Sequence, residues 1–149
     1  MASIEESADS AAPRYLITRV GGQRVAWVMS SVREIIPSRT PTRLPGAPEW
    51  VLGLLNLRGT VVTVVDLANR LGLPPGAGQS VLMVESGPKV VGVRVDAVDA
   101  VAAAEDARVE PVEGARSADG MVAGMVRLEH GTALLMDADV IIRPFRMDG

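Results

Sequence analysis

The sequence is dominated by short apolar runs that are broken by glycine, proline or charged turn residues. This pattern is typical of many short β-strands. Tight hairpin turns need residues with positive φ, and the pair Gly21-Gly22 supplies them between two such runs. The pair Arg58-Gly59 separates two further apolar runs. Hydrophobic residues make up 48% of the chain but aromatic residues only 3%, so the core rests on aliphatic side chains, and the abundant valine favours strands. We therefore expect an all-β protein with short helices.

The chain also repeats itself. An offset of 71 residues places Val51, Gly53, Leu57 and Asp66 on Val122, Gly124, Leu128 and Asp137, and an offset of 66 places Val25 and Val32 on Val91 and Val98. Each aspartate precedes a short segment that it can cap as a helix. The repeat predicts two β-modules of about five short strands and a brief helix each, packed as two small barrels. We expect one domain over residues 14–149, with subdomains at about 14–79 and 80–149, after a disordered tail over residues 1–13.

Charge is divided between the two predicted modules. Residues 15–79 hold seven arginines against three acids, whereas residues 80–149 hold seven basic residues against twelve acids. The difference is either ordinary scatter over solvated faces or a sign that the modules present different potentials to different partners. The whole chain has a formal net charge of -3. That field is too weak to collect nucleic acid or an anionic membrane, so neither is expected as a partner.

The composition excludes most chemistry. Cysteine is absent and His130 is the single histidine, so we expect no disulfide, no thiol catalysis, no metal site and no cofactor. His130 stands beside Gly131 in a predicted turn, where an exposed imidazole has nothing to orient it. The sequence contains neither a phosphate-binding glycine motif nor a GxSxG nucleophile elbow. The chain is therefore expected not to be an enzyme.

The sequence also bears on location. Its first residues are small, polar and acidic, unlike those of a signal peptide. Its longest apolar stretches fall well short of the ~20 residues that span a bilayer. We expect a cytoplasmic protein that does not insert into the membrane.

Two charged residues stand out as candidates for binding a partner. Glu34 is a lone acid within an arginine-rich stretch, and Arg58 occupies a predicted hairpin tip beside Gly59. An arginine in a turn is usually no more than a solvated side chain. A guanidinium and a carboxylate can pair in a bidentate manner, however, so these two residues could meet from neighbouring strands and fix a groove.

Four segments, in the right order, resemble the CheW domain family. Residues 43–67 are similar to its proline-containing loop, its Gly-x-x-Asn-Leu-Arg-Gly hairpin and its apolar strand that ends in Asp-Leu. Residues 32–35 are similar to its Val-x-Glu-Ile, and residues 91–98 to its Val-Gly-x-x-Val-Asp-x-Val. Residues 134–137 fit its last strand and helix start. The resemblance extends over residues 15–143.

The resemblance implies two small five-stranded SH3-like barrels and a non-catalytic adaptor. Such an adaptor couples chemoreceptors (methyl-accepting chemotaxis proteins) to the histidine kinase CheA in a chemosensory array. The implied partners are the cytoplasmic tips of the receptors and the regulatory domain of the kinase, which would associate the chain with membrane-bound arrays. Carried over residue by residue, the resemblance assigns receptor binding to Val32, Glu34 and Arg58, and shaping of the hairpin to Gly53, Asn56 and Gly59. It names no kinase-contact residue.

The chain departs from the family pattern in two places. Ala68 follows Asp-Leu where an arginine is common, with Arg70 two residues later, and Trp27 and Ser30-Ser31 precede Val32 where Gly, Ile and Asp are common. These departures suggest two alternatives: a divergent variant that binds the kinase regulatory domain but not receptors, or one that serves a non-flagellar chemosensory pathway. A small-ligand binder or enzyme built on two barrels is a third alternative. It needs a pocket with convergent polar groups.

Overall fold

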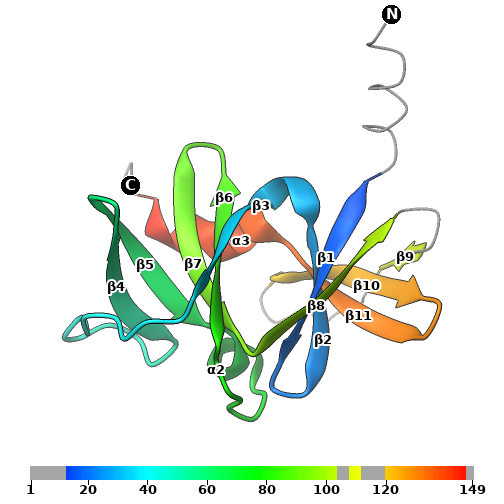
Figure 1. Ribbon diagram of the computed structural model, residues 1–149, viewed down its shortest axis with the longest axis horizontal. Coiled ribbons are helices and arrows are strands. Elements are labelled where there is room, and N and C mark those ends of the chain that lie inside the picture. Colours follow the sequence, from blue (N-terminus) through cyan, green and yellow to red (C-terminus); the bar gives the residue numbers. More distant parts are fainter. Residues whose placement is uncertain (1–12, 104–107, 112–119, 147–149) are drawn as a thin grey trace, which may run out of the picture.

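The computed structural model describes residues 13–103, 108–111 and 120–146. It confirms an all-β protein with short helices, in which two sheets lie side by side (Figure 1). Sheet A has the strand order β8-β1-β2-β11-β10-β9, and sheet B has the order β3-β6-β7-β5-β4. The predicted tail over residues 1–13 lies outside the described residues, apart from Pro13.

The elements are short throughout. Sheet A consists of β1 (Arg14–Val20), β2 (Gln23–Val28), β8 (Ala97–Ala103), β9 (Arg108–Glu110), β10 (Val122–Leu128) and β11 (Gly131–Met136). Sheet B consists of β3 (Val32–Pro37), β4 (Val51–Leu57), β5 (Thr60–Asp66), β6 (Ser80–Ser86) and β7 (Lys89–Val95). The α-helices are α2 (Leu67–Leu71) and α3 (Ala138–Ile142), and the 3-10 helices are η1 (Met29–Ser31) and η4 (Arg143–Phe145).

The internal repeat is visible strand by strand. An offset of 66 carries β1, β2 and β3 onto β6, β7 and β8, and an offset of 71 carries β4, β5 and α2 onto β10, β11 and α3. The parallel pairings correspond as well: Val64 opposite Gly92 in sheet B becomes Leu135 opposite Ala26 in sheet A. Each sheet thus contains the five repeated strands that were predicted, and β9 adds a sixth strand to sheet A.

The predicted division into residues 14–79 and 80–149 does not describe how the strands pair. Sheet B is built from one continuous segment, residues 32–95, whereas sheet A joins residues 14–28 to residues 97–136. Sheet A combines the hairpin β1–β2 of the first repeat with β8, β10 and β11 of the second. Sheet B combines the hairpin β6–β7 of the second repeat with β3, β4 and β5 of the first. An offset identifies related strands but carries no information on which copy each strand pairs with, so the expected boundary near residue 79 does not coincide with the division between the sheets.

Equivalent aspartates begin both α-helices, as predicted. The Asp66 side chain accepts a hydrogen bond from the N–H of Asn69 at 3.3 Å, and Asp137 accepts from the first turn of α3. The backbone N–H of each aspartate also donates to the residue just before the preceding hairpin, Trp50 or Met121, at 2.7 Å in both cases. These bonds fix where each strand ends and each helix begins.

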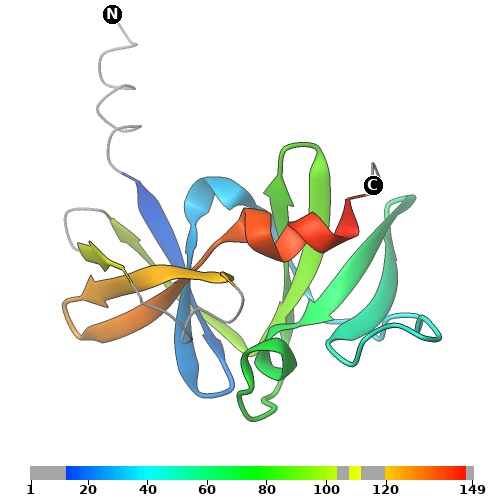
Figure 2. The same cartoon turned by 180° about the vertical axis from the view of Figure 1, so that it is seen from behind.

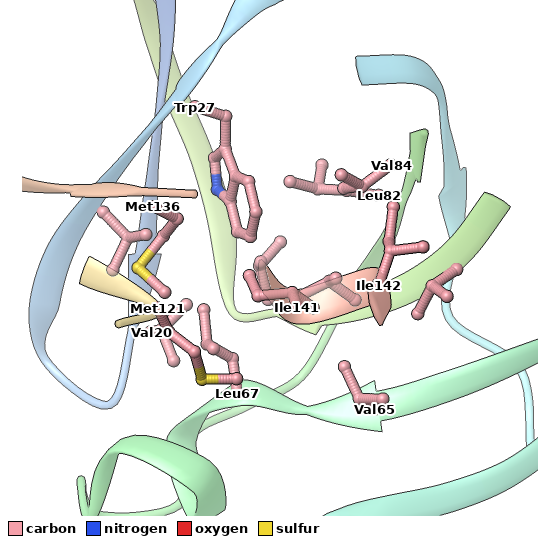
Figure 3. Packing of buried hydrophobic residues seen from close by; sticks show 14 of the residues in the cluster. Val20, Trp27, Val65, Leu67, Leu82, Val84, Met121, Met136, Ile141 and Ile142 are labelled. Carbon is pink, nitrogen blue, oxygen red and sulfur yellow. The ribbon is translucent and has the colours of Figure 1, made fainter. Parts of the chain in front are cut away.

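Three hydrophobic clusters stabilise the fold. The largest lies between the sheets (Figure 3) and includes Trp27, whose side chain is wholly buried. The indole N–H of Trp27 donates to Oγ1 of Thr18 at 3.2 Å, and that hydroxyl donates to the carbonyl of Val25 at 2.9 Å, so the buried polar groups are satisfied. Smaller clusters belong to sheet A and to sheet B separately. Because the largest core is shared, the two sheets form one unit.

Two further segments join the sheets. The helix α3 leaves β11 of sheet A and packs on β6 and β7 of sheet B (Figure 2). Its residues Ile141 and Ile142 are wholly buried. The linker over residues 72–79 is held by Asp96, whose carboxylate accepts the N–H of Gly78 at 2.7 Å and that of Gly21 at 2.8 Å. One carboxylate thus fastens the linker to the β1–β2 turn.

Candidate functional site

An ion pair spans one end of sheet B, which we call the B mouth. Glu34 lies on β3, and Arg58 lies in the turn between β4 and β5. Nη2 of Arg58 donates to Oε1 of Glu34 at 2.6 Å. The predicted pair is formed, but not between neighbouring strands: β3 and β4 are the two edges of the sheet, with three strands between them. The pair therefore joins two edges that no backbone ladder connects.

The turn that carries Arg58 has a constrained backbone. Arg58 has a φ of 51° and Gly59 a φ of 87°, the combination of positive values that a tight two-residue hairpin turn requires. Among the described residues, Arg58 is the only one other than glycine with positive φ. The side-chain oxygen of Asn56 accepts the N–H of Gly59 at 3.0 Å and closes the turn. Asn56 and Gly59 therefore hold Arg58 in a conformation that costs a side-chain-bearing residue about 1–2 kcal/mol.

Gly53 shapes the same hairpin from its other end. Its φ is 141°, and an added Cβ would lie 2.1 Å from the backbone oxygen of Thr42. The approach is this close because Thr42 and Leu54 exchange two backbone hydrogen bonds of 2.8 Å. Glycine at position 53 thus allows the proline-rich loop after β3 to pair with β4.

The pairing shifts the protonation equilibria of both side chains. The hydrogen bond from Arg58 lowers the pKa of Glu34 below its usual value, and attraction to the charges of Arg58 and Arg33 acts in the same direction. The hydrogen bond to Glu34, together with its charge, raises the pKa of Arg58. The side chains are 29% exposed for Glu34 and 69% exposed for Arg58, so solvent and salt screen the attraction.

A pocket of about 240 Å³ opens beside the ion pair. Its apolar lining comes from Leu57, Val62, Met83 and Val90, and its polar lining comes from Arg33, Glu34, Arg58 and Thr60. Val62 and Met83 are buried and form the floor. A pocket with an apolar floor and a fixed charge pair suits a side chain inserted by a partner protein. The acid in its lining, Glu34, is already engaged by Arg58.

The remaining predicted binding residue, Val32, lies elsewhere. It begins β3, pairs with Val84 and packs against the large core between the sheets. It does not line the pocket that Glu34 and Arg58 share. Two lining residues, Met83 and Val90, were not predicted from the sequence; the middle strands β6 and β7 bring them to the pocket. Their apolar character was visible, but only the strand order places them beside β3 and β5.

The other polar candidates do not converge. His130 lies in the β10–β11 turn with its side chain 86% exposed, 4.0 Å from the equally exposed Glu129. In the part of the chain that the structure describes, no three His, Cys, Asp or Glu side chains are grouped so as to hold a metal ion. None of the described helices is long and apolar enough to cross a membrane.

Two interlocked β-modules around a shared core, with a charge-paired mouth over an apolar pocket, define a small all-β protein whose two open sheets are consistent with paired SH3-like barrels. Comparison with known families makes the assignment specific. The chain belongs to the CheW-like domain family, whose model matches residues 14–145. The resemblance noted in the sequence is confirmed.

Individual relatives agree with this assignment. The chain is 38% identical over 96 residues to the probable chemotaxis protein CheW of Rhizobium etli, and the match covers 62% of each protein, so the chain spans less than two thirds of that relative's length. It is 27% identical over 134 residues to the chemotaxis protein CheW of Bacillus subtilis, covering 87% of this chain and 86% of the relative. The crystal structure of the scaffolding protein TtCheW from Thermoanaerobacter tengcongensis matches with a TM-score of 0.76 at 22% identity, covering 84% of each chain, and shows the same fold.

Proposed function

We propose that this chain is a non-catalytic adaptor that couples chemoreceptors to a CheA-type histidine kinase in a chemosensory array. Membership of the CheW-like family supports the adaptor class. The observation that carries the receptor assignment is the Glu34–Arg58 ion pair beside the pocket of the B mouth. The resemblance implies a receptor-binding role for these same two positions.

The chemistry of the B mouth suits a protein partner. Arg58 is exposed at a hairpin tip, where arginine often dominates binding energy, and an apolar pocket lies directly beside it. The Asn56 hydrogen bond and the ion pair to Glu34 fix the tip before binding. Little conformational entropy is then lost when a partner docks. The kinase regulatory domain would occupy another surface, since a coupling protein holds both partners at once.

Calorimetric titration of the full chain with a receptor cytoplasmic fragment, and separately with a kinase regulatory domain, tests the proposal. Arg58→Glu brings two acids together and should weaken receptor binding by at least about tenfold. Adding Glu34→Arg should partly restore it, because the pair is rebuilt with its charges exchanged. Arg39→Glu makes the same charge change at an exposed position outside the pocket and is the matched control. Equal receptor affinity for the parent, single and double variants would exclude the B mouth as the receptor site.

The same titrations discriminate the alternative role. A parent chain that binds the kinase domain but no receptor fragment would be the divergent variant that its sequence departures suggest. One of those departures has a structural role: Arg70 lies over the Trp50 ring, with 5.2 Å between the guanidinium carbon and the ring centroid. Its position in α2 is therefore explained by packing on Trp50 within the chain.

A further inference from the structure

The internal repeat gives sheet A a second mouth, equivalent to the B mouth, which we call the A mouth. A pocket of about 410 Å³ opens there. It is lined by Ile17, Arg24, Asp99, Ala100, Val101, Ala102, Leu128, Glu129 and His130. These residues come from β1, β2, β8, the end of β10 and the β10–β11 turn, which are the repeat counterparts of β6, β7, β3, the end of β4 and the β4–β5 turn at the B mouth.

The two offsets relate the linings position by position. Leu57 corresponds to Leu128 and Met83 corresponds to Ile17, so the apolar character of both positions is kept. The charges are not kept. The counterpart of Arg58 is Glu129, that of Arg33 is Asp99, and that of Glu34 is Ala100. The counterpart of Val90 is Arg24, so the A mouth has acids where the B mouth has arginines and an arginine where the B mouth has a valine. The two mouths are equivalent in position, but their charges are rearranged.

At the B mouth, Arg58 at the hairpin tip pairs with Glu34 on the opposite strand. At the A mouth the position of Glu34 is taken by Ala100, so the tip residue Glu129 has no charged side chain at that position to pair with. The side chain of Glu129 is 82% exposed, and among the described residues its ion-pair contact is the exposed His130 at 4.0 Å. The other acid, Asp99, is already matched by Nε of Arg19 at 2.8 Å. Arg24 packs its guanidinium against the turn, where a Cβ at Gly131 would lie 3.2 Å from its Nη1. Glu129 is thus the exposed charge at the tip.

The apolar part of the A mouth is also more open. Ile17 is buried beneath it, but Val101 on β8 is 47% exposed. Because β8 is an edge strand of sheet A, no strand among the described residues pairs with β8 on the side away from β1. Covering such a side chain removes apolar surface from water at about 25 cal/mol per Å². The A mouth therefore presents an apolar surface beside the acid Glu129, which forms no ion pair across the mouth with any cation that the structure describes, Arg24 included.

We propose that the A mouth is a second protein-docking site, one that accepts a partner loop carrying an arginine or lysine next to an apolar side chain. The cation pairs with Glu129, and the apolar side chain covers Val101 and Leu128. This cation–acid pair would correspond to the Arg58–Glu34 pair at the B mouth, but it would form between two chains and not within one. An adaptor with two mouths of opposite chemistry separates its partners by charge. Only the identity of the partner rests on the adaptor function proposed above.

A peptide titration tests the site without assuming any partner. The probe is acetyl-Leu-Arg-amide, titrated into the ¹⁵N-labelled full chain and followed by amide chemical shifts. We expect saturable shifts at residues 98–102 and 128–131, and none there with acetyl-Leu-Glu-amide. The double variant Ala100→Glu with Glu129→Arg rebuilds the ion pair of the B mouth and should abolish the shifts while leaving the remaining spectrum native. Absent shifts, equal shifts with both peptides, or shifts retained in a natively folded double variant would overturn the proposal.

Protein partners then identify the occupant. Glu129→Arg should weaken binding of either the receptor fragment or the kinase regulatory domain by at least about tenfold and leave the other unchanged. Arg127→Glu, an exposed charge change on β10 outside the pocket, is the control. A folded Glu129→Arg chain that binds both proteins as the parent does, or that loses both, would refute docking at the A mouth. If the parent binds neither protein, the proposed adaptor function is refuted. The peptide titration alone then tests whether the A mouth is a docking site.

Discussion

Arg146 donates a hydrogen bond from Nη2 to Oδ1 of Asp139, and this contact ties the end of the described chain to α3. The same carboxylate accepts the hydroxyl of Ser86, at the tip of the β6–β7 hairpin, at 2.9 Å, and Nη2 of Arg143 at 3.1 Å. These bonds, that from Arg146 foremost, hold the pKa of Asp139 far below its usual range. One acid thus joins three segments.

The first prediction concerns pH. Since the pKa of Asp139 is lower in the folded chain than in the unfolded chain, where it is about 3.9, its contribution to stability is complete above about pH 5. The contribution begins to decline as the pH falls below about 4 and is fully lost only when the pH falls through the lower folded-state pKa. Asp139→Asn should therefore lower the free energy of unfolding at pH 7 and have a smaller effect at pH 3. Urea unfolding at both pH values measures this, with Glu129→Gln as the control. A deficit of equal size at both pH values would contradict the assignment.

Gly53→Ala should destabilise the chain by about 2–3 kcal/mol, because the new methyl group meets the Thr42 oxygen and the backbone has positive φ. Gly87→Ala is the matched control. Its φ is 60° and nothing lies within 4 Å of an added Cβ, so only the conformational cost of about 1 kcal/mol is expected. Urea unfolding of both variants gives the comparison, and equal losses would show that the close approach to Thr42 has no energetic weight.

Thr18→Val should cost about 1–3 kcal/mol of unfolding free energy despite the similar shape of the two side chains. The indole N–H of Trp27 loses its acceptor in a fully buried site. Thr18→Ser keeps the hydroxyl and loses only a methyl group, so it should be milder. Unfolding followed by tryptophan fluorescence ranks the three chains. A serine variant less stable than the valine variant would show that the methyl matters more than the hydrogen bond.

Fragments cut at the linker should reassemble. Residues 1–75 and 76–149 each contain one repeat, yet each sheet needs strands from both. Either fragment alone should lack native circular dichroism, and an equimolar mixture should recover it together with the blue-shifted fluorescence of buried Trp27. Cutting inside β7, between Val91 and Gly92, is the control, because it divides a buried central strand. Native signal from a single fragment would contradict the exchange of strands between repeats.

The repeat explains how much of the fold was predictable. Spacing alone located the hairpins, the two aspartate caps and the five strands of each module, because these features depend on local turn and cap chemistry. The spacing did not predict which strands pair with one another. Leu135 pairs with Ala26 and Val64 pairs with Gly92. Two copies of one pattern present nearly the same apolar strands, so the pattern does not tell which copy each strand pairs with.

The candidate site was also only partly predictable from the sequence. Glu34 and Arg58 could be proposed from charge and turn position, and they do meet. Val32 is half-buried and packs against the core between the sheets, because the register of β3 against β6 shifts between Val32 and Glu34. No sequence pattern predicted this shift in the pairing of β3 with β6. The acidic counterpart at Glu129 became recognisable only when the strand exchange placed β8 and the β10–β11 turn at one mouth.

The strand exchange also sets an order of events during synthesis. Sheet B is encoded without interruption by residues 32–95, so all of its strands have been made while the second half of sheet A is still missing. The hairpin β1–β2 has to wait until β11 has been synthesised to find its parallel neighbour across more than a hundred residues. Contacts of such long range form slowly. The nascent chain thus completes the mouth with the built-in ion pair first and the acidic mouth last.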